Sequence, residues 1–321
     1  MRRPLRLSRN VVAAAAAAGT FLIWPAGPAQ LASAAAVQSL AGTGTAQHAQ
    51  HAGSVSTPAC DPTASLQPPP GPPMVTPGSF MAAIRTRGYL IAGVDLNTYP
   101  FGYLKASNGQ PEGFDIDMLH AIAAAIFGNP NKIKFVATTD DHRSPFVQSG
   151  RVDIVAHTMT VTCKRWRSVD FSTVYFDAHQ RILVEDGSPI QGVDDLFGLK
   201  VCATGTTTTS AAYLRQHHAV VVGAYDWTDC LVKLQQGDVA AISTDDSILA
   251  GLKAQDPYTE IVGPQLEDEP YGLAISKQHP DLVRFVNAVL DQMRADGQWA
   301  AIYERWIGSP APAPPPAHYQ S

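Results

Sequence analysis

Short apolar runs alternate with stretches of helical periodicity from residue 80 to residue 306, and this alternation most constrains the fold. Apolar runs between turn residues are typical of buried strands, whereas apolar residues three and four positions apart are typical of helices. Their regular succession predicts an α/β protein with a mainly parallel sheet. Strands are expected at 89–94, 133–136, 152–155, 181–184, 201–203, 220–222, 240–243 and 271–275, and helices at 81–86, 116–127, 145–149, 211–216, 229–236, 246–253, 282–296 and 299–306.

The order of these segments predicts two lobes rather than one continuous sheet. The helices within 282–306 have no further strands to pack on, so we expect them to return to the first part of the chain. A second lobe, 178–270, would then be inserted in a first lobe made of 79–177 plus 271–308. Two lobes joined by two chain crossings can move as a hinge.

The N-terminal residues have the pattern of a secretory signal. Four arginines precede an apolar run over 11–24 and an Ala-rich cleavage site at 31–34, which predicts a signal peptide over 1–34. An uncleaved membrane anchor is the alternative, although the run is short for a spanning helix. Residues 35–78 are predicted to be a Pro/Ala/Gly-rich linker and 309–321 a Pro-rich tail. The signal pattern predicts export to the cell envelope or the extracellular space. No lipidation cysteine follows the apolar run.

Export would place the cysteines in an oxidising compartment, where disulfides form. The four cysteines allow three pairings. Cys202 ends a short strand and Cys230 opens a helix in the same part of the chain, so we favour Cys202–Cys230, which leaves Cys60–Cys163. Free buried thiols are the alternative. A metal site is not expected, because the cysteines and histidines lack ligand spacing.

The segment 158–165 is rich in threonine and ends on Arg165, and about eighty residues later an apolar run ends on Asp245. Thr162 can cap a helix that begins there, and the amides of a helix start favour an anion. The guanidinium fork of Arg165 matches a carboxylate, and the carboxylate of Asp245 matches an ammonium. Together they predict a site for an α-amino acid. The alternatives are a surface role for Arg165 and a capping role for one of Asp245 and Asp246.

Two further segments are weaker candidates. Gly205, Thr206 and Thr207 follow a strand and can form a nest of amides and hydroxyls, although a structural turn is the favoured interpretation. Tyr99, Phe101 and Tyr103 follow the first strand; such aromatics belong to the core or cover the aliphatic part of a small ligand.

Composition and motifs exclude several functions. The formal charge of −5, or −9 once the four arginines of the signal are removed, does not suggest nucleic acid binding. The sequence has no Gly-x-Ser-x-Gly, His-Glu-x-x-His or phosphate-binding loop. We therefore expect a protein that is not an enzyme and needs no cofactor.

These residues resemble bacterial extracellular solute-binding proteins for polar amino acids. The matching motifs are 113–117, 158–165 with 169–172, 205–206, 235–237 and 243–245, and segments 61–66, 177–183 and 243–252 are most similar to the actinobacterial glutamine/glutamate-binding type. The resemblance covers about 88–308 and implies the two-lobed periplasmic-binding-protein fold with a hinge, the second lobe being inserted in the first. It also implies a monomer that delivers an amino acid to an ABC permease or reports it to a membrane sensor.

The resemblance also implies roles for single residues. Arg165 and Thr160, with the backbone at Thr158, match the groups that hold the α-carboxylate in the family. Thr206 and Thr207 match the groups that the family's second lobe contributes to the α-carboxylate. Asp245 matches the partner of the α-ammonium, and Phe101 matches the aromatic wall of the site.

The ligand side chain is left open by these assignments. Glutamate or aspartate is favoured and glutamine or asparagine comes next, with His157, Lys105 and Arg181 as the basic groups available for side-chain contacts. The alternative function is a periplasmic enzyme on the same fold, similar to cyclohexadienyl dehydratase, for which Asp177 and Glu185 are the available acids.

Overall fold

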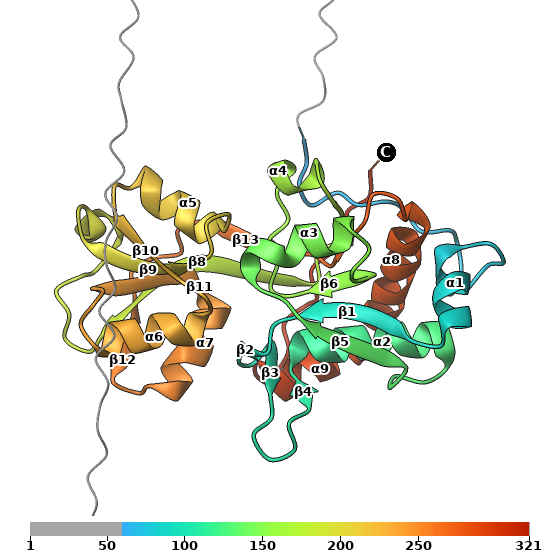
Figure 1. Cartoon of the computed structure of the whole chain (residues 1–321), viewed down its shortest axis with the longest axis horizontal. Coiled ribbons are helices and arrows are strands. Elements are labelled where there is room, and N and C mark those ends of the chain that lie inside the picture. The colour runs from blue at the N-terminus through green and yellow to red at the C-terminus, as the bar shows by residue number, and fades with distance from the viewer. Residues whose placement is uncertain (1–59, 321) are drawn as a thin grey trace, which may run out of the picture. The chain divides into compact units, whose positions relative to one another are not determined.

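A computed structural model gives the fold of the chain, and it describes residues 60–320. The predicted signal peptide and the first part of the predicted linker lie outside the described residues. The described residues form two lobes, each built on its own sheet with helices packed against it, which confirms the predicted two-lobed α/β fold (Figure 1). The expectation of a mainly parallel sheet was wrong, because both sheets mix parallel and antiparallel pairs.

The first lobe holds a five-stranded sheet in the order β5-β1-β6-β14-β7. β1 is parallel to β5 and β6, and β14 is antiparallel to β6 and β7. The strands are β1 (Leu90–Val94), β5 (Ile133–Ala137), β6 (Ile154–Ala156), β7 (Asp170–Phe171) and β14 (Ala274–Ile275). The helices are α1 (Phe80–Arg87), α2 (Phe114–Phe127), η1 (Asp140–His142), α3 (Arg143–Gln148), α4 (Cys163–Trp166), α8 (Pro280–Ala295) and α9 (Gln298–Trp306). A small three-stranded antiparallel sheet that the sequence did not predict follows β1. Its strands are β2 (Asn97–Thr98), β3 (Gly102–Leu104) and β4 (Pro111–Glu112).

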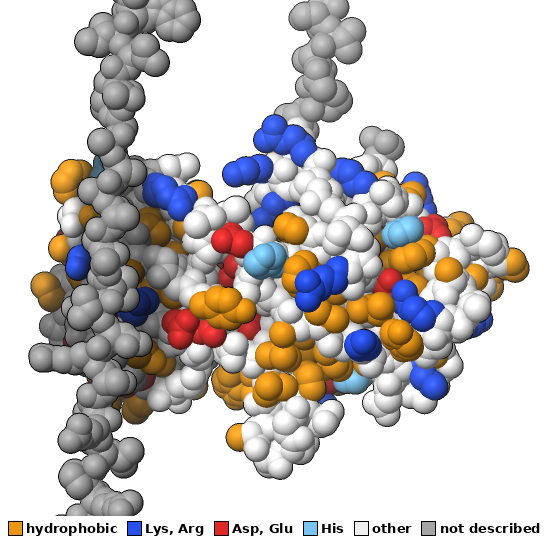
Figure 2. All heavy atoms as spheres, viewed as in Figure 1, with side chains coloured by type: hydrophobic (Ala, Val, Ile, Leu, Met, Phe, Trp, Pro, Cys, Tyr) orange, Lys and Arg blue, Asp and Glu red, His pale blue; other side chains and the backbone are white. Residues whose placement is uncertain are grey.

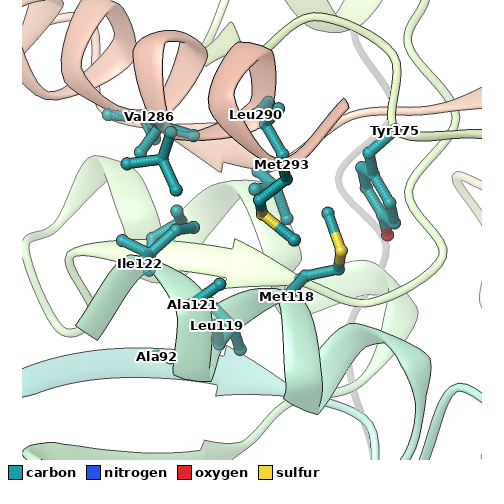
Figure 3. Packing of buried hydrophobic residues seen from close by; sticks show 14 of the residues in the cluster. Ala92, Met118, Leu119, Ala121, Ile122, Tyr175, Val286, Leu290 and Met293 are labelled. Atoms are coloured by element: carbon teal, nitrogen blue, oxygen red, sulfur yellow. The ribbon is translucent and has the colours of Figure 1, made fainter. Parts of the chain in front are cut away.

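The core of the first lobe lies where α2 and α8 meet over the sheet. Met118 and Ile122 of α2 pack with Val286, Leu290 and Met293 of α8 in one buried cluster (Figure 3). The C-terminal helices therefore return to the first lobe, as their lack of following strands predicted.

The second lobe holds a six-stranded sheet in the order β10-β9-β11-β8-β12, with β13 also paired to β8. β9, β10 and β11 are parallel to one another, and β8 is antiparallel to β11, β12 and β13. The strands are β8 (Phe176–Glu185), β9 (Lys200–Thr204), β10 (Val220–Ala224), β11 (Ala241–Asp245), β12 (Thr259–Val262) and β13 (Asp268–Tyr271). The helices are η2 (Val193–Leu196), α5 (Thr209–Gln216), α6 (Trp227–Gln235) and α7 (Asp246–Gln255).

β8 and β13 are the two segments by which the chain passes between the lobes (Figure 1). We expected one strand over 271–275, but β13 ends at Tyr271 in the second sheet and β14 begins at Ala274 in the first. Gly272 lies at this change of sheet. A Cβ at Gly272 would lie 2.5 Å from Cγ1 of Val161, so only glycine lets the chain pass so close to that side chain.

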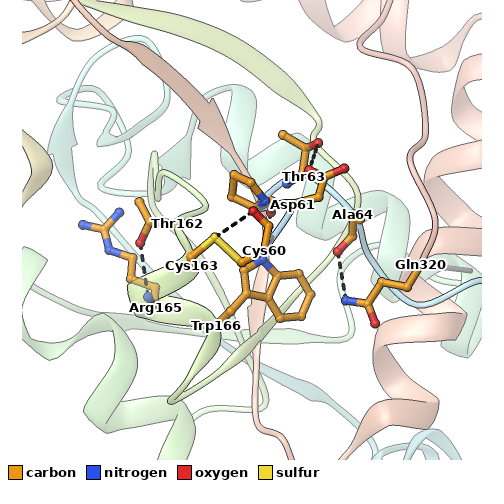
Figure 4. Close-up of a disulfide and its surroundings, with 10 residues drawn as sticks. Cys60, Asp61, Thr63, Ala64, Thr162, Cys163, Arg165, Trp166 and Gln320 are labelled. Atoms are coloured by element: carbon orange, nitrogen blue, oxygen red, sulfur yellow. Dashed lines mark hydrogen bonds between the residues drawn. A yellow bond between two sulfur atoms is a disulfide. The ribbon is translucent and has the colours of Figure 1, made fainter. Parts of the chain in front are cut away.

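Both predicted disulfides, Cys60–Cys163 and Cys202–Cys230, are present. The first joins the N-terminal arm to α4, where the indole of Trp166 donates a 2.8 Å hydrogen bond to the carbonyl of Pro62 (Figure 4). Further along the arm, Ser65 is fully buried, and its N–H donates to the carbonyl of His318 in the C-terminal tail. This part of the predicted linker is therefore packed on the first lobe together with the tail.

Candidate functional site

The predicted charged residues meet at a small cavity between the two lobes. The segment after β6, the start of α3 and α4 contribute from the first lobe, and the end of β11 and the start of α5 contribute from the second. The cavity has a volume of about 10 Å³, which is room for about one water molecule, so the lobes are closed on each other. Its lining consists of Asp140, Arg143, Thr158, Thr160, Arg165, Thr208, Thr209, Ser210, Trp227, Thr244, Asp245 and Ile248.

Arg165 reaches the cavity from the first turn of α4. Thr162 caps this helix as predicted, since its hydroxyl accepts the N–H of Arg165 at 3.1 Å. The guanidinium donates to the carbonyl of Thr160 at 2.6 Å, and no carboxylate of residues 60–320 lies within 4.0 Å of it. Burial and the neighbouring Arg143 lower the pKa of Arg165 to about 10. A cation without an anionic partner here favours a ligand that brings a carboxylate.

Asp245 lies at the end of β11, on the opposite side of the cavity. It is 4% exposed, and its Oδ2 accepts the hydroxyl of Tyr271 at 2.5 Å. Burial and the charge of Glu269 raise the pKa of Asp245 well above its usual range. Asp246, not Asp245, accepts the exposed N–H groups near the helix start, from Ser247 at 2.8 Å and His179 at 3.1 Å. Asp246 therefore takes the role at the helix start, and Asp245 lines the cavity.

Arg143 lines the cavity although the sequence did not predict it. It is 4% exposed, forms a 2.9 Å ion pair with Asp140 and donates to the carbonyl of His157 at 3.0 Å. Its Nη2 makes no hydrogen bond to any described residue. Its position could have indicated a site residue, because Arg143 begins a helix shortly after the carboxyl end of β5, and ligands of open α/β sheets bind at that edge.

Thr158 lies in the left-handed region, with φ of 41°, and its N–H is bonded within the first lobe. The N–H donates to Oδ2 of Asp115 at 2.9 Å, and the hydroxyl of Tyr175 donates to Oδ1 at 2.6 Å. Asp115 thus fixes the backbone beside the cavity. Burial raises the pKa of Asp115 to about 6.

The raised pKa of Asp115 makes stability depend on pH. A carboxyl group whose pKa is higher in the folded than in the unfolded protein stabilises the fold below the unfolded value of 3.8 and loses that contribution as pH rises through about 6. We expect this residue to lower the free energy of unfolding by about 2–3 kcal/mol between pH 4 and pH 7. Urea unfolding of the wild type and of Asp115→Asn at both pH values measures it. An equal pH dependence in the two proteins would contradict the assignment.

Thr206 and Thr207 are not among the cavity residues, because a carboxylate of the protein itself occupies their amides. Asp141 in η1 of the first lobe accepts both backbone N–H groups, at 3.0 and 3.1 Å, and both hydroxyls, at 3.3 and 2.8 Å. Gly205 has φ of +58°, and a Cβ there would lie 2.9 Å from Oδ1 of Asp141. The predicted anion nest therefore exists, but it holds the two lobes together instead of facing the cavity.

Removing this contact should loosen the closed form. Burial raises the pKa of Asp141, but the hydrogen bonds from Thr207 and Thr206 outweigh it, so the pKa is lowered and the carboxylate stays charged. We expect Asp141→Ala to weaken ligand binding by about 1 kcal/mol, or roughly fivefold, through faster dissociation. Stopped-flow binding measures the rate. Asp194→Ala, at an exposed position in η2 of the second lobe, serves as a charge-matched control, and an unchanged dissociation rate would argue against a closing role for Asp141.

The structure does not bring four other predicted residues to the cavity. Phe101 is fully buried in an aromatic cluster, with ring centroids 5.7 Å from Tyr271 and 5.0 Å from Phe176. Lys105 is exposed in the loop between β3 and β4, and its Nζ forms an ion pair with Glu112 at 3.0 Å. Arg181 donates to the carbonyl of Gly263 at 2.5 Å, on the sheet face opposite to Asp245.

His157 lines a separate cavity of about 230 Å³ with Asp95 and Asp226. Its Nε2 lies 2.9 Å from the carbonyl of Thr138. The two acids considered for an enzyme, Asp177 and Glu185, do not line the closed cavity either. On the face that Figure 2 shows, acidic side chains gather at the junction of the two lobes.

Two lobes that close on a polar cavity with opposite charges on its two sides define a receptor for a small solute. Residues 90–309 match the bacterial extracellular solute-binding proteins, family 3, and the chain belongs to this family. The family and fold predicted from the sequence are thereby confirmed. Within residues 60–320, no helix is both long and apolar enough to cross a membrane.

Several known proteins are similar to this chain. The ABC transporter glutamine-binding protein GlnH of Bacillus subtilis is 37% identical over 229 residues, which cover 71% of this chain and 84% of the relative. The glutamate/aspartate import solute-binding protein of Salmonella typhimurium is 27% identical over 247 residues, which cover 73% and 82%. A solved ancestral arginine-binding protein bound to glutamine has a TM-score of 0.66 and 35% identity, over 70% of this chain and 99% of that chain. These relatives are binding proteins rather than enzymes, in agreement with the prediction for this chain.

Proposed function

We propose that this chain binds an acidic amino acid, glutamate or aspartate, outside the cell. One observation carries the proposal: two guanidinium groups, Arg165 and Arg143, and the carboxylate of Asp245 line the same buried cavity. An acidic amino acid brings two carboxylates and one ammonium, so each of its charges would meet an opposite charge. Arg165 would hold the α-carboxylate with Thr160, Asp245 the ammonium, and Arg143 the side-chain carboxylate.

Glutamine is the second candidate, and the pairing of Arg143 with Asp140 favours it. A carboxamide needs a donor and an acceptor side by side, and the guanidinium and carboxylate of this pair offer both. The names of the relatives support both ligands, since one is a glutamine-binding protein and another a glutamate/aspartate-binding protein.

The partner follows from the ligand and the family. We infer that the chain delivers its amino acid to an ABC permease, as the name of the Bacillus subtilis relative indicates for that protein. Reporting the amino acid to a membrane sensor is the alternative. In either case the lobes must open to admit a ligand, because the closed cavity has room for about one water molecule.

Isothermal titration of the mature protein with glutamate, aspartate, glutamine, asparagine and arginine tests the proposal. We expect glutamate or aspartate to bind most tightly. Tighter binding of glutamine than of both acidic amino acids would select the second candidate. Binding of none of the five would overturn the proposed function.

A further inference from the structure

Glu269 and Asp245 lie on two strands that flank β8 on opposite edges. Glu269 of β13 pairs with Ala178, and Asp245 of β11 pairs with Gln180. Residues paired across two strands, and residues two positions apart on one strand, point their side chains to the same face, so both carboxylates lie on one face of the sheet. Tyr271 confirms the arrangement, because it follows Glu269 by two residues and its hydroxyl reaches Asp245 at 2.5 Å.

The carboxylate of Glu269 is only partly satisfied. Its Oε2 accepts the hydroxyls of Thr160 in the first lobe and of Thr209, at 2.9 Å, in the second. The side chain is only 1% exposed, and its Oε1 has no hydrogen-bond donor among the described residues. Buried polar atoms of native proteins nearly always have a partner, so this oxygen calls for one.

No basic side chain of the described residues forms an ion pair with either carboxylate. No basic nitrogen of residues 60–320 lies within 4.0 Å of Glu269 or Asp245. Burial raises the pKa of both groups, and the charge of Glu269 raises that of Asp245 further. Arg165 acts on Glu269 from a longer distance and lowers its pKa without pairing with it. Two buried carboxylates in this state favour a positively charged ligand group near them.

We propose that Glu269 is a second ligand for the α-ammonium of the bound amino acid, acting together with Asp245. An ammonium has three N–H donors and needs more than one acceptor. Oδ2 of Asp245 accepts from Tyr271 and Oδ1 accepts only a long 3.4 Å bond from the hydroxyl of Thr244, so this Oδ1 and Oε1 of Glu269 are the acceptors with capacity left on this face. Since Glu269 also bonds Thr160 and Thr209, it links the ammonium to both lobes. This inference rests on the proposed function.

The test compares two ligands that differ only in the group in question. L-glutamate carries the ammonium, and 2-hydroxyglutarate keeps both carboxylates but has a hydroxyl in its place. Affinities are measured by titration for L-glutamate and by competition at millimolar concentration for 2-hydroxyglutarate, on the wild type, Glu269→Gln and Glu267→Gln. Glu267 is exposed two residues away and is the control for the loss of one negative charge.

We expect Glu269→Gln to weaken L-glutamate binding roughly 10- to 100-fold and 2-hydroxyglutarate binding less than about threefold, because only the first ligand loses a charged partner. Glu267→Gln should change neither. Equal losses for both ligands would show that Glu269 only links Thr160 and Thr209. An unchanged L-glutamate affinity would show that Glu269 has no role in binding. Either result overturns this inference but leaves the proposed function standing. A wild type that binds no amino acid overturns the proposed function with it. Should glutamine bind more tightly, L-glutamine and its 2-hydroxy counterpart replace the pair.

Discussion

Replacing Arg165 by alanine should abolish most of the binding of any α-amino acid. The guanidinium is the cation at the cavity without an ion pair among the described residues, and its loss would leave the ligand's buried α-carboxylate without a charged partner. Such a loss costs on the order of 2–5 kcal/mol, which is about a 30- to several-thousand-fold rise in Kd. Isothermal titration with glutamate, aspartate and glutamine measures it, and all three should be affected alike.

Two matched variants sharpen this prediction. Arg165→Lys keeps the charge but loses the planar fork, so it too should bind poorly. Arg167→Ala removes an exposed arginine from the end of the same helix and should leave the affinity unchanged. Near wild-type affinity in Arg165→Ala would show that the α-carboxylate is held elsewhere.

Replacing Arg143 by glutamine should reverse the preference between glutamate and glutamine. The change removes the cation assigned to the side-chain carboxylate and leaves Asp140 unpaired beside it. Glutamate would then meet a buried like charge, whereas a carboxamide could still donate to Asp140. We expect glutamate binding to fall on the order of 100-fold and glutamine binding about tenfold or less.

The controls separate specificity from folding. Arg143 also donates to the carbonyls of Asp140 and His157, so its loss should lower the melting temperature as well. The ratio of the two affinities within the same variant removes this common effect. Arg151→Gln, an exposed arginine after α3, should leave the ratio unchanged. A constant ratio in Arg143→Gln would assign the side-chain end of the ligand to other residues.

Most of the fold could be predicted from the sequence because strands and helices leave local patterns in it. Apolar runs and helical periodicity found most strands and helices within a few residues of their bounds, and the C-terminal helices could be returned to the first lobe. The small sheet over 97–112, β7 and β12 were missed because their strands are two to four residues long. The single strand expected over 271–275 is two strands because β13 pairs with β8 and β14 pairs with β6 and β7, and no local pattern shows such pairing.

The candidate site was accessible only in part. Thr160, Arg165 and Asp245 stand at a helix start and a strand end, where local geometry already selects charged and hydroxyl side chains, and the structure brings them together. Thr206 and Thr207 have the local signal of an anion nest, yet which anion fills it depends on Asp141, about 65 residues away in the other lobe.

The alternation of strands and helices, the family motifs and the charged groups at element ends could be predicted, because they depend on neighbours along the chain. The three-dimensional fold was needed to show that Arg143 lines the cavity, that His157, Lys105 and Arg181 do not, and that Glu269 shares a sheet face with Asp245. A side chain's partners depend on strand register and lobe closure, and both join residues that lie far apart in the chain.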